Sequence, residues 1–259
     1  MPTAAPPQGA GASLLGRVID PFGQPLDGLP LPSGGLAPVW RTGDAGRWPE
    51  PPALLPHGPE AQGGTHVIEA LLALRRGQRV GLVSPNPVAH RTMLAMVSRH
   101  AVCDACVIAV VGEYARVACG FLDETLSPPA KARSVVVLST ADQPAIVRAR
   151  AADTATEIAE AWRAAGRHVL LLVDSLSRYV MARREIELAS GRPLSMRSRA
   201  VTVHEAVNIL CVRPVAAPQP PADRGSVTAV YGAPNRGEDA DGSISRALRG
   251  VLERRFVLG

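Results

Sequence analysis

The sequence predicts an α/β domain with a mainly parallel sheet flanked by helices. From residue 64 onward, short and continuously apolar runs alternate with stretches whose apolar residues recur at helical spacing. Strands that are apolar on both faces are typical of parallel sheets, which helices cover on both sides. Hydrophobic residues make up 46% of the 259-residue chain and aromatic residues only 3%, so we expect a substantial and largely aliphatic core.

The first part of the chain has a different character. Residues 1–12 consist mostly of Pro, Ala and Gly and are expected to be disordered. Residues 14–19 are predicted to form a strand, and 21–28 have the composition of a turn. More than half of the 24 prolines lie in the first 60 residues, which favours an extended covering segment over helices. We therefore expect a Pro/Gly-rich segment with one short strand at 13–60 and the α/β domain at 61–259.

Within the α/β domain the expected elements alternate along the chain. Strands are predicted at 79–83, 107–111, 133–139, 168–173, 226–231 and 256–258, and helices at 67–74, 89–100, 116–126, 144–165, 177–189 and 243–253. Pro144 suits the first turn of its helix. The proline-rich stretch 213–225 is predicted to be a surface loop.

Composition excludes several classes of function. The formal net charge of +5 is spread along the chain, which indicates a solvated surface, with an anionic ligand or an acidic membrane surface as the alternative. Nucleic acid is not expected as a partner, because stacking aromatics are scarce. No apolar run approaches the ~20 residues of a membrane span, and the N-terminus lacks the pattern of a signal peptide. A cytoplasmic location is therefore expected, with the inner face of the membrane as an alternative.

The four cysteines are expected to be structural thiols. Cys103 and Cys106 form a CxxC pair, but no second pair or histidine pair follows at zinc-ligand spacing. Cys119 and Cys211 are isolated in the sequence.

Two acidic residues come directly after predicted strands. Glu113 follows the strand at 107–111, and Asp174 follows the strand at 168–173. Ligands of parallel sheets bind at the carboxyl ends of the strands, so these carboxylates could position a water molecule and a magnesium ion. The alternative is that each carboxylate caps the helix that follows it.

Residues 84–92 have the position and length of a phosphate-binding loop, whose pattern is GxxxxGK[ST]. The residues in this stretch are Ser84, Pro85, Asn86, Pro87, Val88, Ala89, His90, Arg91 and Thr92. Proline has no backbone N–H to donate to a phosphate. Losing two charge-assisted hydrogen bonds of about 1.5–3 kcal/mol each would weaken binding by about 10²–10⁴-fold.

Two alternatives to the loss of a phosphate cradle stay open. Arg91 has no acceptor for a metal ion. Arg91 could instead meet a phosphate with its forked donors while Thr92 supplies a hydroxyl. His90 and Arg91 could also belong to a solvated first turn of the helix.

Four stretches give the chain a resemblance to a known family. They are LLGRVIDPFGQPLDG (14–28), GTHVIEALLALRRGQRVG (64–81), and the segments 133–193 and 225–258. The chain resembles the ATPases of type III secretion and flagellar export systems, which are relatives of the rotary ATP synthase alpha and beta subunits. The resemblance implies a RecA-like P-loop NTPase fold. It also implies that an N-terminal β-barrel and a C-terminal helical domain of the family are absent here.

The resemblance also assigns roles, and the departures from the family pattern concentrate in the loop. Glu113 matches the catalytic glutamate, although Tyr114 replaces the arginine of the family's GER motif. Asp174 matches the magnesium-directed aspartate, and Ser175 and Arg178 keep the family pattern that follows it. His90 stands at the position of the phosphate-binding lysine, and Arg91 at that of the metal-binding hydroxyl. Glycines of the family are replaced by Pro85, Pro87 and Ala89.

Whether the chain is an enzyme stays open at this point, and two functions are compatible with the sequence. The first is a catalytically impaired relative of the export ATPases that acts as an interaction or scaffold subunit and needs no cofactor. The second is an active ATPase that hydrolyses Mg-ATP through Glu113 to energise protein secretion. A degraded gene product without a role is the third alternative. The expected partners are protein subunits of the export apparatus, as a homo- or hetero-oligomer, with peripheral membrane association and no nucleic acid.

Overall fold

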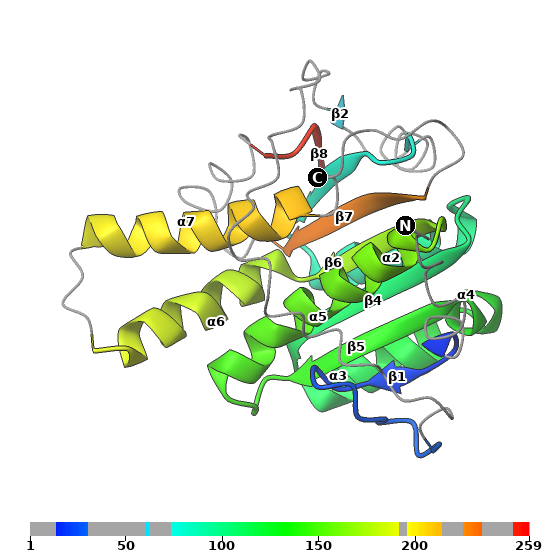
Figure 1. Cartoon of the computed structure of the whole chain (residues 1–259), viewed down its shortest axis with the longest axis horizontal. Coiled ribbons are helices and arrows are strands. Elements are labelled where there is room, and N and C mark those ends of the chain that lie inside the picture. The colour runs from blue at the N-terminus through cyan, green and yellow to red at the C-terminus, as the bar shows by residue number, and fades with distance from the viewer. Residues whose placement is uncertain are drawn as a thin grey trace, which may run out of the picture.

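The protein contains one parallel sheet with the strand order β1-β5-β4-β6-β7-β3-β8-β2 (Figure 1). The computed structural model describes residues 14–30, 61–62, 74–191, 196–213, 225–234 and 251–258. Every pairing between neighbouring strands is parallel. The strands are β1 (Val18–Ile19), β2 (Ala61–Gln62), β3 (Arg79–Ser84), β4 (Ala105–Glu113), β5 (Ser134–Thr140), β6 (His168–Asp174), β7 (Ser226–Pro234) and β8 (Arg254–Val257). The predicted fold class is confirmed.

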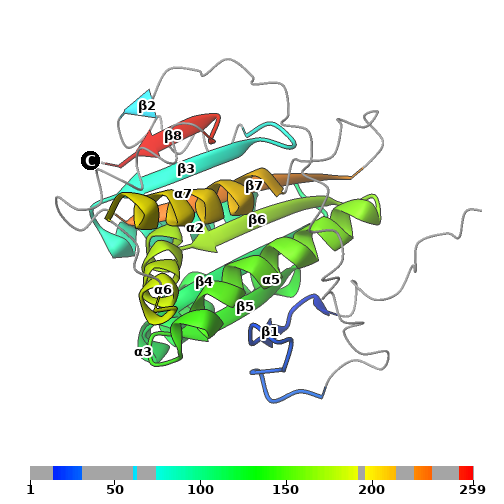
Figure 2. The ribbon, with the colours of Figure 1, turned by 60° about the vertical axis from the view of Figure 1, so that its left-hand side comes forward.

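Helices cover both faces of the sheet (Figures 1 and 2). They are α2 (Pro87–His100), α3 (Ala115–Gly120), the short π-helix η2 (Phe121–Thr125), α4 (Pro128–Ala132), α5 (Ala145–Ala164), α6 (Leu176–Ala189) and α7 (Met196–Val212). Successive residues of β4 face opposite sides: Val107 packs toward α5, α6 and α7, and Ile108 packs toward α2, α3 and α4. Both residues are fully buried, which explains the continuous apolar runs in the sequence.

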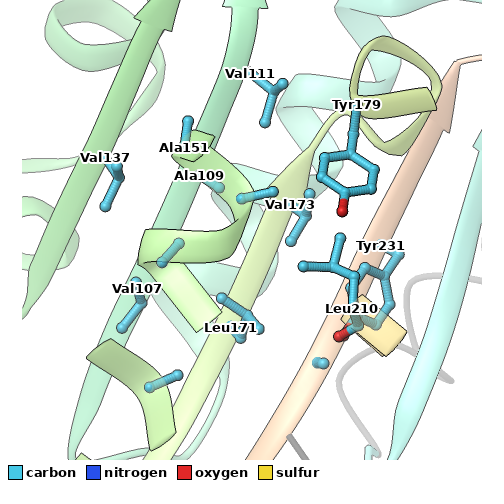
Figure 3. Packing of buried hydrophobic residues seen from close by; sticks show 14 of the residues in the cluster. Val107, Ala109, Val111, Val137, Ala151, Leu171, Val173, Tyr179, Leu210 and Tyr231 are labelled. Atoms are coloured by element: carbon cyan, nitrogen blue, oxygen red, sulfur yellow. The ribbon is translucent and has the colours of Figure 1, made fainter. Parts of the chain in front are cut away.

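The larger of the two buried clusters lies under α5, α6 and α7 (Figure 3). Alternate residues of β4, β5, β6 and β7 meet small side chains of α5 such as Ala151, so the long helix lies close to the sheet. Tyr179 of α6 and Tyr231 of β7 are its largest fully buried side chains. The Tyr231 hydroxyl donates a 3.3 Å hydrogen bond to the carbonyl oxygen of Leu210 in α7, so this buried polar group is satisfied.

The structure corrects several predicted boundaries and one omission. The predicted helix 116–126 is α3 followed by the π-helix η2, and only Val18–Ile19 of the predicted strand 14–19 pairs in the sheet. Helix α7 was not predicted at all. Residues 251–253, the described end of the predicted helix 243–253, are not helical. The predictions for residues 1–12, 31–60, 67–73, 214–224 and 243–250 lie outside the described residues.

All four cysteines lie in the described part of the chain. All four cysteines are free thiols, and Cys106 and Cys211 lie in the two buried clusters. Burial raises the pKa of the Cys211 thiol to about 12. No group of three or more His, Cys, Asp or Glu side chains in the described ranges is placed to hold a metal ion. Among the described helices, none is long and apolar enough to cross a bilayer.

Candidate functional site

The carboxyl ends of β3, β4 and β6 lie along one edge of the sheet. β4 and β6 are neighbours, with Val110 of β4 paired to Asp174 of β6, and β7 separates β6 from β3. The chain leaves β3 into α2 on one face and leaves β6 into α6 on the other. Ligands of open α/β sheets bind in a crevice of this kind. Glu113, Asp174 and the stretch 84–92 therefore lie along this edge.

Glu113 is placed by a bulge at the end of β4. The register between β4 and β5 shifts between Val110 and Glu113, and Gly112 adopts a φ of 58°, a conformation that disfavours any side chain. The Gly112 N–H donates to Ser139 Oγ at 3.0 Å, which fixes the bulge against β5. The Glu113 side chain is consequently turned inward and is almost fully buried.

Asp174 is the last residue of β6 and is also buried. The interpretation of Asp174 as a helix cap is wrong: the side chain of Ser175 caps α6, and its Oγ accepts the N–H of Arg178 at 3.3 Å. Glu113 accepts the N–H of Tyr114 at 2.9 Å, but α3 has no side-chain cap. Both carboxylates therefore remain available for other partners.

Most of the phosphate-loop stretch is helical. Helix α2 begins at Pro87, two residues earlier than predicted, and leaves only Pro85 and Asn86 between it and β3. Asn86 caps the helix: its Oδ1 accepts the N–H groups of Val88 at 2.9 Å and Ala89 at 3.4 Å. The carbonyl oxygen of Asn86 also accepts the N–H of His90 at 3.0 Å.

From residue 85 to residue 90, no backbone donor is left for a phosphate. The Asn86 N–H donates to Ser84 Oγ at 3.2 Å, and Pro85 and Pro87 have no N–H. A phosphate cradle consists of several amide groups that point at one anion. Here each amide from residue 85 to residue 90 is either missing or bonded within the stretch.

His90 is packed into the sheet. Its side chain is only 1% exposed, and its Nε2 lies 3.5 Å from Oδ1 of Asp174. Among the described residues, neither ring nitrogen has a hydrogen-bond partner. The ring lies against β7 so closely that a Cβ atom on Gly232 would be 2.1 Å from Nε2. The solvated first turn considered from the sequence is therefore wrong for His90.

Arg91 points inward as well, with a side chain only 13% exposed. Its Nη2 donates to Oε2 of Glu113, and its Nε donates to Oδ2 of Asp174 at 3.3 Å. Arg178 of α6 also contacts Glu113, with two hydrogen bonds of 2.5 Å and 2.9 Å. Two carboxylates and two guanidinium groups thus form a buried network without net charge.

The network affects the titration of Asp174. Burial alone raises the pKa of its carboxyl group, but the nearby His90 ring and the charges of Arg91 and Arg178 outweigh this effect. The pKa of Asp174 is therefore lowered below its usual value. Asp174 is therefore ionised at neutral pH, and the guanidinium group of Arg91 donates a hydrogen bond to it.

The residues of this site do not fit Mg-ATP. Magnesium requires oxygen ligands in near-octahedral geometry, whereas Arg91 brings a positive charge without an acceptor between the two carboxylates. The Thr92 hydroxyl is directed back into the helix and donates to the carbonyl oxygen of Val88 at 3.0 Å. Arg91 and Thr92 are thus both engaged within the protein, which leaves the alternative of a phosphate held by these two residues without support.

The sheet, its strand order and the carboxylates at the ends of adjacent strands define a RecA-like nucleotide-binding domain. Residues 64–259 match the ATP synthase alpha/beta family, nucleotide-binding domain. The chain belongs to this family.

The chain is similar to ATPases of bacterial export systems. It is 37% identical to the flagellum-specific ATP synthase of Bacillus subtilis, with 96% of this chain and 55% of that protein covered. It is also 37% identical to the SPI-2 type 3 secretion system ATPase of Salmonella typhimurium, with the same shares covered. The chain spans about half the length of these curated relatives.

Solved structures give the same result. A prototypical ATPase from the type III secretion system of pathogenic bacteria superimposes with a TM-score of 0.77 at 32% identity, covering 96% of this chain and 70% of that one. The assembled ATPase EscN from enteropathogenic E. coli has a TM-score of 0.73 at 32% identity, covering 96% and 58%. The predicted resemblance is confirmed.

Sequence reasoning named Asn86 as part of the loop but missed its capping role, and it missed Gly232 altogether. Asn86 directly before a proline is a readable signal for a helix N-cap followed by proline at the first helical position. Gly232 carries no such signal, because its role depends on a ring from α2 lying over β7.

Proposed function

We propose that this chain is a catalytically impaired member of the export ATPases, which acts as an interaction or scaffold subunit in type III protein secretion. The observation that carries the proposal is the phosphate-loop stretch, in which Asn86 takes up the amides of Val88 and Ala89 and two prolines remove others. Each lost charge-assisted hydrogen bond is worth about 1.5–3 kcal/mol. The loss of several therefore removes the main source of affinity for a triphosphate.

Calorimetric titration of the purified chain with Mg-ATP tests the proposal. No binding is expected at nucleotide concentrations that saturate the flagellum-specific ATP synthase of Bacillus subtilis, which serves as the positive control. A dissociation constant in the micromolar range would contradict the proposal. The titration is repeated without magnesium, because a nucleotide bound without the metal would still contradict the loss of the phosphate cradle.

The alternative is an active ATPase that uses Glu113, and it has its own test. Hydrolysis by the active enzyme would be lost in Glu113→Ala and unchanged in Glu124→Ala, a matched control in which an exposed glutamate of η2 is removed. The close pairing of Glu113 with Arg91 and Arg178 speaks against a role in activating water, because both of its oxygens already accept hydrogen bonds from guanidinium groups.

The proposed role in an assembly follows from the family and from the intact core. EscN has been solved as an assembled ATPase and in complex with its central stalk EscO. Light scattering of this chain, alone and mixed with an active export ATPase from the same cell, tests whether it joins such an assembly. A mixed oligomer is expected, and two species that elute separately at all mixing ratios would contradict the role as a subunit.

A further inference from the structure

A single guanidinium group joins the two carboxylates of the site. Arg91 extends from the first turns of α2 and contacts Glu113 at the end of β4 and Asp174 at the end of β6. Its Nε and Nη2 belong to one rigid planar group, so the two carboxylate oxygens that they contact lie close together. Carboxylate oxygens are also the ligands that hard divalent cations prefer.

Both carboxylates need a positive partner in order to remain buried. The Glu113 and Asp174 side chains are only 2% and 3% exposed, and a buried charge without a partner is strongly destabilising. Arg178 contacts only Glu113 among these two. Among the described residues, Arg91 is therefore the one that donates hydrogen bonds to both Asp174 and Glu113.

We propose that Arg91 is a built-in counter-ion that takes over the role of a divalent cation between Glu113 and Asp174, and that this one guanidinium excludes the cation. The inference rests on the proposed function only in that the site holds no Mg-ATP. It goes beyond that function, because it assigns the exclusion of metal to one residue and predicts that the carboxylate pair is a latent cation site. Replacing Arg91 by a neutral residue changes the local charge from zero to −1 and leaves Asp174 without this guanidinium.

Mn²⁺ binding to the full chain tests the inference with the metal alone. We compare the wild type with Arg91→Ser and Arg91→Gln by electron paramagnetic resonance and by thermal unfolding with and without Mn²⁺. The wild type is expected to take up no Mn²⁺ at the site and to melt at the same temperature with and without it. Both variants are expected to bind one Mn²⁺ at least about tenfold more tightly than the wild type and to melt at a higher temperature when the metal is present.

Three further variants separate the proposed role from a general effect of charge. Arg91→Lys keeps the positive charge and is expected to exclude Mn²⁺ as the wild type does. Arg91→Ser combined with Asp174→Asn is expected to lose the Mn²⁺ again. Arg150→Ser removes an arginine that pairs with Glu157 on α5, away from the site, and is expected to leave Mn²⁺ binding unchanged.

The inference is overturned if the wild type already binds Mn²⁺ between these carboxylates, or if a folded Arg91→Ser protein binds no more Mn²⁺ than the wild type. If neither neutral variant folds without metal, refolding in the presence of Mn²⁺ gives the result: recovery of folded protein supports the inference, and no recovery overturns it. Binding of Mg-ATP by the wild type would contradict the proposed function instead, so the two failures are distinguishable.

Discussion

Replacing Gly232 by alanine is expected to destabilise the protein, because the His90 ring lies directly on β7 at this position. A Cβ atom on Gly232 would be 2.1 Å from Nε2 and 2.4 Å from Cε1 of His90, and 3.1 Å from the carbonyl oxygen of Val173. The ring is buried against the sheet, so an alanine at position 232 would force the ring either to move together with α2 or to adopt another rotamer. Overpacking of this kind costs about 1–3 kcal/mol, which corresponds to a decrease in Tm of about 2–12 °C for a chain of this size.

A double-mutant cycle with His90→Ala measures this contact by urea and thermal unfolding. The alanine at Gly232 is expected to cost much less stability when the imidazole ring is absent, with a coupling energy of at least about 1 kcal/mol. Gly120→Ala is the control, since a Cβ atom there meets no atom closer than 4.0 Å, and alanine in a helix is neutral or stabilising. A Gly232→Ala protein as stable as the wild type, or equal costs with and without the ring, would refute the reasoning.

Three other predictions concern the site and the helices behind it. The pKa of Asp174 is lower in the folded state than its usual value of 3.8. The contribution of this carboxylate to the free energy of unfolding is therefore complete at neutral pH and is lost as the pH falls below about 3.8. Urea unfolding across this range should show a steeper loss of stability for the wild type than for Asp174→Asn. Asn86→Ala should lower the free energy of unfolding by about 0.5–2 kcal/mol through the lost N-cap, whereas Asn86→Ser should retain most of it, and equal stabilities would contradict the capping role. Tyr179→Phe should cost about 0.5–1.5 kcal/mol, because the hydroxyl donates to Asp153 at 3.4 Å and accepts from Arg183 at 2.9 Å; an unchanged urea midpoint would contradict this.

The sheet could be predicted from the sequence because its central strands are buried on both faces. Val107 to Val111 and Val169 to Val173 are continuous apolar runs, and in the structure each is fully part of β4 or β6. Burial on both faces and a parallel arrangement are the same physical condition. The order of the strands was not predictable in this way, since apolar runs do not specify their neighbours.

Helix α7 was missed because its composition opposes its conformation. Six of its residues, Val201, Thr202, Val203, Val207, Ile209 and Val212, are β-branched, which lowers helix propensity. The buried residues Val203, Val207, Leu210 and Cys211 nevertheless recur at positions i, i+4, i+7 and i+8. Packing of this face against α5 and α6 outweighs the propensity, and the periodicity was the signal that could have revealed the helix.

The acidic residues of the site could be found from the sequence, but the direction in which the basic side chains point could not be predicted. Glu113 and Asp174 followed from their positions after strands. His90 lies on the same helical face as the buried Met93, Leu94 and Val97, so its burial was readable once the helix was extended back to Pro87. The pairing of Arg91 depends on the distance between α2 and the ends of β4 and β6, which the sequence does not encode locally.

The placement of β3 has a consequence for how the chain folds. Among the described strands, β3 hydrogen-bonds only to β7 and β8, which come from the far end of the chain. A nascent polypeptide that has not yet reached Ser226 offers β3 no partner, and pairing across so long a stretch of sequence is slow. The strand and helix on either side of the altered loop therefore join the fold late in synthesis, after β4, β5 and β6 have already associated.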